Sequence, residues 1–297
     1  MSRIYVCHTF YHVYVSILKE MKLEREDAAY EKGDIALSSI STDFGDLEER
    51  LRKTGIFRQV MALDEKREEF FPQLVMLAKY RKNYSNILKH MVNRMIFTKA
   101  LAKCEEPYMT IDFASYQDIY VFCDSDPIGY YLNYKHIPYH AVEDGLDCLK
   151  NLDDAYVANH GHFKLKAWFS RHNLIFIMNG WGKYCLDMEI NDRSVVPTDC
   201  PRFVEVPRKP LEKALTSRQK KLMVQAFIPD ADALLAQLEP RFPGEEFVMF
   251  LTEPHPVDIE ARKKVCLDIV AKYGQGYRVL IKPHPRDMID YTALCPD

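Results

Sequence analysis

The sequence lacks several patterns that would place it in a familiar class of protein. Its eight cysteines include no C-x-x-C pair, which speaks against a zinc site or a small disulfide scaffold and favours reduced thiols. The longest purely apolar run, Leu174 to Met178, is far too short to cross a bilayer. The amino terminus also lacks the basic region and long apolar core of a secretory signal. We therefore expect a cytoplasmic protein.

A strong charge of one sign is absent as well. The chain has 40 Lys and Arg against 43 Asp and Glu, and the formal net charge of −3 argues against a general nucleic-acid binder. Hydrophobic residues make up 47% of the chain and charged residues 28%, as in an ordinary globular protein. A length of 297 residues leaves room for two α/β domains.

Strand and helix patterns alternate through the first part of the chain. Apolar strands are expected at 3–7, 34–39 and 57–63, with helices at 11–21 and 44–53 between them. This βαβαβ order predicts a parallel sheet. No glycine fingerprint follows the first strand, which speaks against a dinucleotide-binding domain.

The turn after the first strand carries polar side chains. Ligands of parallel α/β sheets bind at the carboxyl ends of the strands, so we expect His8, Thr9, Tyr11 and His12 to be positioned for contact with a substrate. Thr9 can instead cap the following helix, and the histidines can be incidental, an alternative that stays open for His12.

A further strand, expected over 117–123, ends in Asp124-Ser125-Asp126-Pro127. An Asp-x-Asp pair can hold a divalent metal ion and a nucleotide diphosphate. However, an aspartate followed by proline is typical of a helix start, which favours a capping role for Asp126. Asp124 and Ser125 are then left to face a substrate.

Two strand ends carry complementary acid and base groups. The first follows a strand expected over 139–142, where Glu143 and Asp144 precede Gly145. One carboxylate of such a pair can act as a general base while the other modulates its pKa, and glycine allows a sharp turn. Alone, the pattern is also typical of a turn before a helix.

The second strand end follows an apolar strand expected over 277–281. Pro283 and Pro285 stiffen the corner and present His284, beside Lys282, to an anion. A surface histidine at a strand exit is the simpler interpretation of this motif alone. Together, the two strand ends predict a cleft with one wall from each half of the chain.

A strand over 246–251 and a helix over 258–273 precede this motif. Thr252, Glu253 and the helix amino end can receive a nucleotide phosphate or ribose. Asp258 is a rival candidate for the base, although it can equally satisfy the helix end.

The segment 68–104 is expected to be helical and basic. Residues 70–103 include no Asp or Glu but seven Lys or Arg. Such a helix can lie on anionic lipid or bind an anionic glycolipid, so 79–103 is a candidate for peripheral contact with the inner face of the cytoplasmic membrane. A solvated face or a homodimer contact is the commoner explanation.

The segment from residue 146 to about residue 201 shows no clear pattern, and we expect irregular structure that bridges two domains. Prolines then mark a linker, followed by a short strand over 203–206 and helices over 211–238. The predicted domains are 1–200 and 201–297.

These motifs resemble those of a known family. Glu143-Asp144-Gly145 and His284-Pro285 resemble the acidic-acidic-Gly and His-Pro motifs of bacterial sialyltransferases. The stretches IYVCHTFYHVYVSILKE and IKPHPRD are most similar to the lipooligosaccharide sialyltransferase family, glycosyltransferase family 52, with the capsular polysialyltransferases as more distant relatives. The resemblance runs from residue 3 to about residue 292.

The resemblance implies a GT-B-like fold of two Rossmann-like domains, CMP-sialic acid as donor, inversion at the anomeric carbon, and no metal or other cofactor. Glu143 or Asp144 would deprotonate the acceptor hydroxyl, and His284 would bind the departing CMP phosphate. The donor side would include Gly145, Thr252, Glu253, Lys282 and Pro285, and the acceptor side His8, Thr9, Tyr11, Asp124 and Ser125. Family members usually continue beyond the His-Pro strand, so the second domain is predicted to be incomplete.

The sequence therefore predicts a metal-independent sialyltransferase acting on a galactose-terminated bacterial surface glycan of lipooligosaccharide or capsule type. Two alternatives remain open. One is a metal-dependent UDP-sugar transferase that uses Asp124 and Asp126, and the other is a non-catalytic subunit that binds a glycan or nucleotide.

Overall fold

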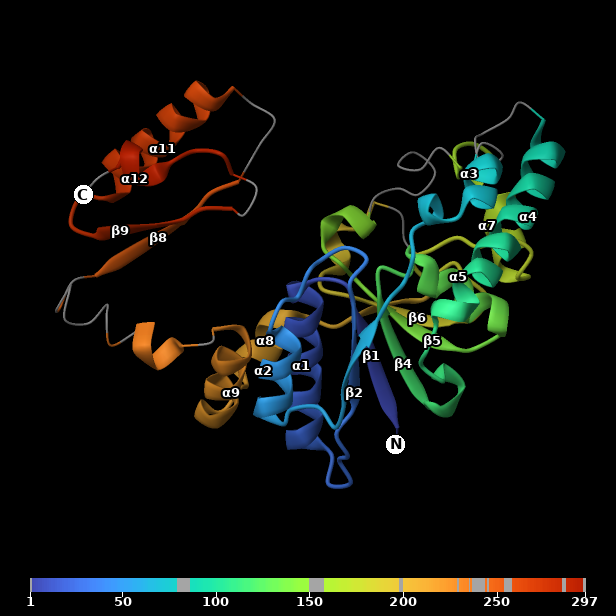
Figure 1. Cartoon of the computed structure of the whole chain (residues 1–297), viewed down its shortest axis with the longest axis horizontal. Coiled ribbons are helices and arrows are strands. Elements are labelled where there is room, and N and C mark those ends of the chain that lie inside the picture. Colours follow the sequence, from blue (N-terminus) through green and yellow to red (C-terminus); the bar gives the residue numbers. More distant parts are fainter. Residues whose placement is uncertain are drawn as a thin grey trace. The chain divides into compact units, whose positions relative to one another are not determined.

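The computed structural model describes most of the chain, in two compact units (Figure 1). The described residues are 2–78, 86–149, 158–197, 200–228, 230–234, 236, 244, 246–253, 258–284 and 287–295. The first unit comprises residues 1–229 and the second residues 230–297.

A seven-stranded parallel sheet forms the centre of the first unit, with strand order β3-β2-β1-β4-β5-β6-β7. Its strands are β1 (Arg3–Cys7), β2 (Asp34–Ser38), β3 (Val60–Leu63), β4 (Asp118–Phe122), β5 (Tyr139–Val142), β6 (Cys185–Ile190) and β7 (Phe203–Glu205). The chain adds β2 and β3 on one side of β1 and β4 on the other, so the topological switch point lies between β1 and β4. The predicted α/β class with a parallel sheet is confirmed.

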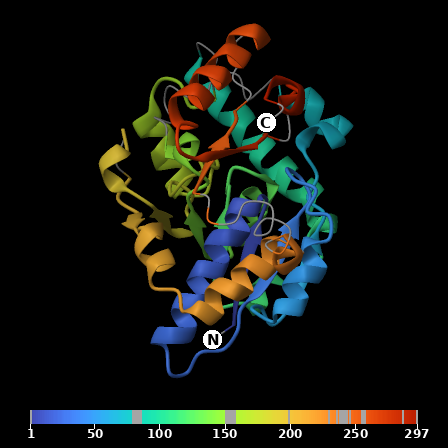
Figure 2. The same ribbon diagram turned by 90° about the vertical axis from the view of Figure 1, so that its left-hand side faces the viewer.

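Helices cover both faces of this sheet (Figures 1 and 2). One face is covered by α1 (Phe10–Glu26), α2 (Leu47–Thr54), α8 (Arg208–Lys213) and α9 (Ser217–Phe227). On the other face lies α5 (Pro127–Lys135), with α3 (Pro72–Ala78), α4 (Ile87–Glu105) and α7 (Phe163–Arg171) packed outside it. Short 3-10 turns occur at Glu68–Phe70, Glu106–Tyr108, Phe113–Ser115, Leu146–Leu149 and Arg193–Val195.

The strands are apolar because both faces of the sheet are covered. Ile4 and Val6 of β1 enter the core beneath α5, while Tyr5 and Cys7 enter the core beneath α1. The carboxyl ends of the strands remain at one edge, where loops carry the polar side chains. Within the described part of the chain, every helix is too short or too polar to cross a bilayer.

The sheet contains a strand, β6, that the sequence pattern did not reveal. The segment after Gly145, expected to be irregular, includes α7 and β6, and β6 pairs with both β5 and β7. The prediction was wrong because only one face of β6 is buried. Cys185, Met188 and Ile190 point into the core, whereas Leu186 is 53% exposed and acidic residues interrupt the apolar run.

The boundary between the units also lies later than the predicted division at residue 200. The strand β7 extends the first sheet, and α8 and α9 pack on the first unit, where the Gln219 amide donates to the Met21 carbonyl at 3.1 Å. The helical stretch expected over 211–238 begins as two separate helices, because Thr216 starts α9 with a capping box.

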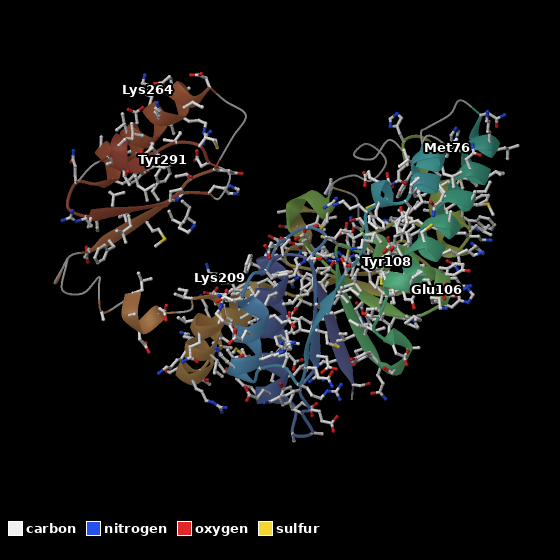
Figure 3. All side chains as sticks on the ribbon, viewed as in Figure 1. Met76, Glu106, Tyr108, Lys209, Lys264 and Tyr291 are labelled. Atoms are coloured by element: carbon white, nitrogen blue, oxygen red, sulfur yellow. The ribbon has the colours of Figure 1, made fainter. Side chains whose placement is uncertain are left out.

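Within its described residues, the second unit contains a two-stranded parallel sheet with helices beside it. β8 (Phe247–Leu251) pairs with β9 (Arg278–Lys282), and α11 (Ile259–Tyr273) and α12 (Tyr291–Leu294) pack beside them. Its small core includes Cys266, Ile289 and Tyr291, the last of which is labelled in Figure 3.

Candidate active site

Polar side chains gather at the carboxyl ends of β1, β4 and β5, beside the switch point of the first sheet. His8 follows β1, His12 lies in the first turn of α1, Cys123 follows β4, and Asp144 follows β5. Parallel strands bring these ends to one edge, so residues far apart in the chain become neighbours. Hydrogen bonds and close contacts connect the four residues.

Asp144 is the exposed carboxylate of this cluster. Its side chain is 31% exposed, and it accepts hydrogen bonds from Nε2 of His12 and, at 2.9 Å, from the Cys123 thiol. Burial acts to raise the pKa of Asp144, but the interactions with His12 and Cys123 outweigh it, so the pKa lies below its ordinary value. Asp144 is therefore an ionised carboxylate that a substrate can reach.

The tautomer of His12 is fixed by the backbone. Its Nδ1 accepts a hydrogen bond from the backbone N–H of His8 at 2.9 Å, so the proton of the neutral ring lies on Nε2, facing Asp144. Burial lowers the pKa of His12 despite the opposing effect of Asp144. The ring stacks on Phe122 with centroids 4.5 Å apart. His12, for which the sequence left both a substrate contact and an incidental role open, thus donates to Asp144 and orients it.

Cys123 supplies the second donor from a strained turn. Its φ is +50°, in the left-handed region that residues other than glycine rarely adopt. Burial and then the charge of Asp144 raise the pKa of Cys123 far above its ordinary value, so the group remains a thiol and can donate.

His8 forms a buried ion pair. Its side chain is fully buried, with Nε2 2.8 Å from Oε1 of Glu65. Burial acts to lower the pKa of His8, but Glu65 outweighs it and the pKa is raised. Glu65 also accepts from the backbone N–H of Ile128 at 3.0 Å, which joins the end of β3 to the start of α5. In this conformation His8 is inaccessible to the acceptor contact predicted for it. The acidic pair Asp64-Glu65 after the third strand was the signal that could have revealed this partner.

The two members of the carboxylate pair differ in their surroundings. Glu143 is buried, and its Oε2 accepts from the backbone N–H of Asn191 at 2.6 Å, beyond the end of β6. Gly145 has a φ of +90°, which glycine adopts without strain, as the predicted sharp turn requires. Glu143 therefore fixes the turn on which Asp144 is exposed.

Asp124 is occupied by internal hydrogen bonds. It accepts from the backbone N–H of Asn179 at 2.9 Å and from the Tyr139 hydroxyl at 3.0 Å, and burial raises its pKa to about 6. Asp126 stands at the N-cap of α5, as predicted. Among the described contacts, however, its carboxylate accepts no capping hydrogen bond, and its Oδ2 lies 3.7 Å from Nε2 of His8. Neither residue resembles the exposed pair that a metal-bound diphosphate needs.

The remaining residues predicted on this side are Thr9, Tyr11 and Ser125. The hydroxyl of Thr9 accepts from the backbone N–H of His12 at 3.4 Å, so it caps α1. Tyr11 is 37% exposed, and Ser125 is also exposed. Both can reach a ligand at the sheet edge.

His8, His12 and Cys123 place potential metal-ligand atoms within 4.8 Å of one another, so ion binding must be weighed. The His12 tautomer argues against it. Coordination through Nε2 would require the proton to move to Nδ1, which would break the hydrogen bond from His8. The cluster as arranged therefore fits donation to Asp144 better than coordination of a metal ion.

In the second unit, Thr252 and His284 lie at neighbouring strand ends, as predicted. Leu251 is paired with Lys282, and the backbone N–H of His284 donates to the Thr252 hydroxyl at 3.0 Å. That hydroxyl donates to Asp287 at 2.8 Å. Hydrogen bonds therefore fix the corner that carries His284.

Other predicted residues of this unit are exposed or have a structural role. Lys282 is exposed and its Nζ donates to the carbonyl of Pro283 at 3.2 Å, and Glu253 is exposed. Asp258 accepts from the backbone N–H of Ala261 at 3.1 Å and caps α11, in agreement with the interpretation that it satisfies the helix end. Pro285 lies outside the described residues.

Comparison with known proteins identifies the family. The sequence model of glycosyltransferase family 52 matches residues 56–297, which is most of the chain. The chain belongs to glycosyltransferase family 52. No curated protein matches it in sequence.

Solved structures similar to this family 52 chain include two bacterial enzymes. The α/β-galactoside α-2,3-sialyltransferase of the luminous marine bacterium Photobacterium phosphoreum matches with a TM-score of 0.51 and 12% identity, over 99% of this chain and 79% of that one. A sialyltransferase from Photobacterium damsela matches with a TM-score of 0.50 and 12% identity, over 100% of this chain and 64% of that one. At such low identity the likeness concerns the fold alone, and the predicted GT-B-like fold is confirmed.

Membership of family 52 makes this chain a glycosyltransferase. Such a reaction uses a nucleotide-sugar donor and a glycan acceptor. Glycosyl transfer needs a base for the acceptor hydroxyl and positive groups for the departing phosphate. Asp144 has the surroundings of the first, and Lys282 and His284 have the chemistry of the second.

Proposed function

We propose that this family 52 enzyme is an inverting, metal-independent sialyltransferase. It moves sialic acid from CMP-sialic acid to a galactose-terminated bacterial surface glycan of lipooligosaccharide or capsule type. The observation that carries the proposal is Asp144, an exposed carboxylate kept ionised by His12 and Cys123 at the switch-point edge. The sialyltransferase motifs and the likeness in fold to two bacterial sialyltransferases support it.

Asp144 acts as the base. It takes the proton of the acceptor hydroxyl as that oxygen attacks the anomeric carbon and the bond from this carbon to the CMP phosphate breaks. His12 and Cys123 hold the carboxylate in one orientation, so the base is preorganised to accept the proton of the acceptor hydroxyl. Exposure favours Asp144 over Glu143, because Glu143 is buried and bonded to Asn191.

The CMP phosphate is received by His284 and Lys282. Both are cationic or can become so, and a charge-assisted hydrogen bond to phosphate strengthens as the leaving group gains charge. A monophosphate leaving group carries less charge than a diphosphate, so protein cations can replace the metal ion that diphosphate donors need.

The test is transfer from CMP-sialic acid to a lactose-terminated glycan, with and without EDTA, beside calorimetric titration with CMP and UDP. We expect transfer and CMP binding to persist in EDTA. Metal-dependent binding of UDP would replace the proposal with a UDP-sugar transferase, and binding of neither nucleotide would indicate a non-catalytic subunit.

A contact with the membrane surface forms part of this proposal, because the acceptor is a surface glycolipid. Leu88, Val92 and Ile96 form one stripe on α4 and are 74%, 54% and 50% exposed. Exposed lysines at 89, 99 and 103 flank the stripe. Met76 of the adjoining α3, labelled in Figure 3, is 67% exposed. Apolar side chains beside lysines suit the inner face of an anionic membrane.

A further inference from the structure

Arg208 occupies the same edge of the first sheet as Asp144, three residues after the end of β7. Its backbone N–H donates to the side-chain oxygen of Asn191 at 2.9 Å. The backbone N–H of Asn191 in turn donates to Glu143 at 2.6 Å. A chain of hydrogen bonds therefore connects Arg208 to the acidic pair.

The guanidinium of Arg208 is buried but incompletely satisfied. The residue is 7% exposed, and one nitrogen, Nη1, donates to the carbonyl of Val206. The other two, Nε and Nη2, are buried and have no hydrogen-bond partner among the described residues. Buried arginines are normally paired, since removing the charge from water costs several kcal/mol.

Two other arginines of the described chain are as deeply buried, and both are satisfied. Arg3 pairs with Glu20, and Arg94 donates to the carbonyls of Ala158 and Phe176 at 2.9 and 3.0 Å. Arg208 is therefore the exception among the described buried arginines.

Two titratable side chains near Arg208, those of Lys19 and Tyr11, respond to its positive charge. Glu189 is already bonded to Lys19, with Nζ and Oε2 2.6 Å apart. Burial lowers the pKa of Lys19 and Arg208 lowers it further, against the effect of Glu189. Tyr11 lies beside the guanidinium. Burial raises the pKa of Tyr11, Arg208 opposes this through its charge and through a polar contact with the hydroxyl, and Glu143 and Asp144 add to the rise. Tyr11 thus connects Arg208 with the exposed carboxylate.

We infer that Arg208, together with the Tyr11 hydroxyl, binds the carboxylate of an acidic sugar substrate. Nε and Nη2 form the side of a guanidinium that grips both oxygens of a carboxylate in two parallel hydrogen bonds. Sialic acid carries its carboxylate on the anomeric carbon, the atom attacked by the hydroxyl that Asp144 deprotonates, so this inference rests on the proposed function. The phosphate is assigned to His284 and Lys282, which leaves Arg208 for the carboxylate.

Access to this site passes Tyr11. The tyrosine is 37% exposed and stands in the first turn of α1, so a ligand that reaches its hydroxyl is also beside the guanidinium. The carboxylate then supplies the negative charge that the buried guanidinium lacks. This pairing selects acidic sugars over neutral ones, because a neutral sugar would leave the cation unpaired.

The first test compares Arg208→Met with the wild type. A buried charge without a partner can be replaced by an apolar side chain at little or no cost in stability, so we expect an unchanged or higher thermal midpoint without ligand. Affinity for CMP-sialic acid should fall roughly 10–100-fold, while affinity for CMP stays unchanged. Arg208→Lys should also bind poorly, because it keeps the charge but loses the planar fork.

Arg202→Met is the matched control, since Arg202 donates to the carbonyls of Gly182 and Cys185. It should lower the thermal midpoint and leave donor affinity unchanged. A lower midpoint in Arg208→Met with donor affinity retained would make Arg208 a structural residue and overturn the inference. Equal weakening of CMP and CMP-sialic acid would assign it to the phosphate and overturn it too.

Free N-acetylneuraminate and its methyl ester separate the inference from the proposed function. Wild type should bind the acid but not the ester, and Arg208→Met should bind neither. If Arg208→Met loses affinity only for the donor, the site binds the carboxylate of the transferred sugar. If it loses affinity only for a sialylated acceptor, the site binds the carboxylate of the acceptor. Either supports the site. If the wild type catalyses transfer but binds the acid and the ester equally well, the inference is refuted and the proposed function stands. If the wild type binds the acid selectively but catalyses no transfer, only the proposed function is refuted.

Discussion

Asp144 and Glu143 are neighbours in the chain, yet their carboxylates have different surroundings. Asp144→Asn should reduce the transfer rate roughly 10²–10⁴-fold and leave CMP binding intact, because an amide cannot take up the acceptor proton. Glu143→Gln should remain within a few-fold of wild type, since its amide oxygen can still accept from Asn191. Steady-state kinetics and calorimetry on both variants provide the measurement. Full activity of Asp144→Asn would move the base elsewhere.

Cys123 tests whether the donors around Asp144 set its ionisation. Without the thiol, the carboxylate loses one stabilising hydrogen bond and its pKa rises. The acidic limb of the kcat/KM pH profile should therefore move to higher pH in Cys123→Ala, with the rate at low pH down roughly tenfold. His12 and His8 face the same carboxylate and are unchanged in this variant.

Cys123→Ser is the control, because a hydroxyl restores the donor. Its pH profile should match that of the wild type. Loss of activity at every pH in both variants, with no displacement of the limb, would show that Cys123 only supports the fold of the turn.

The sequence predicted the site residues that form a local motif and missed those that the strand order brings close. Asp144 and Gly145 form a local motif, so their positions could be predicted from the adjoining residues of the sequence. Glu65 and Arg208 stand after β3 and β7, and their nearness to the site depends on strand order. Sequence spacing carries no such information, and both were missed.

At the scale of elements, α4 is the candidate membrane contact. Leu88→Glu should reduce co-sedimentation with vesicles that contain phosphatidylglycerol roughly tenfold, because it places a charge in the exposed apolar stripe. Lys99→Glu should act in the same direction. Transfer to a soluble acceptor should be unaffected in both variants.

The control for α4 is Lys22→Glu on α1, a charge reversal at another lysine that changes the net charge as much as Lys99→Glu and more than Leu88→Glu. It should sediment like the wild type. Equal loss in all three variants would mean that net charge, not α4, governs association, and no sedimentation of the wild type would remove the membrane contact from the proposal.

The end of α4 also contains a carboxyl group that titrates near neutrality. Glu105 is buried, accepts from the backbone N–H of Lys66 at 3.1 Å, and has its pKa raised from 4.5 to about 7, chiefly by burial. Between these values the folded chain holds a proton that the unfolded chain has released. Stability therefore falls as pH rises from 4.5 through about 7.

Glu105→Gln should remove this dependence. Allowing for solvent screening, we expect it to raise the free energy of unfolding at pH 8 by roughly 1–2 kcal/mol and to have little effect at pH 5. Chemical unfolding at the two pH values, followed by tryptophan fluorescence, provides the measurement. A variant less stable than the wild type at pH 8 would show that the ionised carboxylate is favourable where it stands.

Elements were predicted best where burial is uniform. The strands at 3–7 and 139–142 have the expected bounds, because an apolar run between polar turns signals a strand buried on both faces. β6 is buried on one face only, and its acidic residues concealed it. The third strand begins at Val60 rather than residue 57, within the usual uncertainty of element ends.

At the scale of the molecule, the sequence pattern predicted two α/β units, and the first of them extends further along the chain than predicted. Prolines around residue 200 suggested a linker, yet the chain there continues into β7 and closes the first sheet. Proline marks a break in regular structure, and such a break can lie inside a domain as easily as between two. Only the pairing of β6 with β7 decides the matter.

The division of chemistry between the two units leads to the last prediction. Asp144 belongs to the first unit and His284 to the second, and the proposed reaction uses one residue from each. His284→Ala should weaken CMP binding and turnover by at least tenfold each, because the bond to phosphate exists in the ground state and strengthens as the bond to the sugar breaks. The KM for the acceptor should change little. Hydrogen exchange offers an independent measurement: CMP alone should protect the corner around His284, and CMP with acceptor should also protect the turn around Asp144. Protection confined to the first unit would leave His284 as a residue of a strand exit and refute the cleft with two walls.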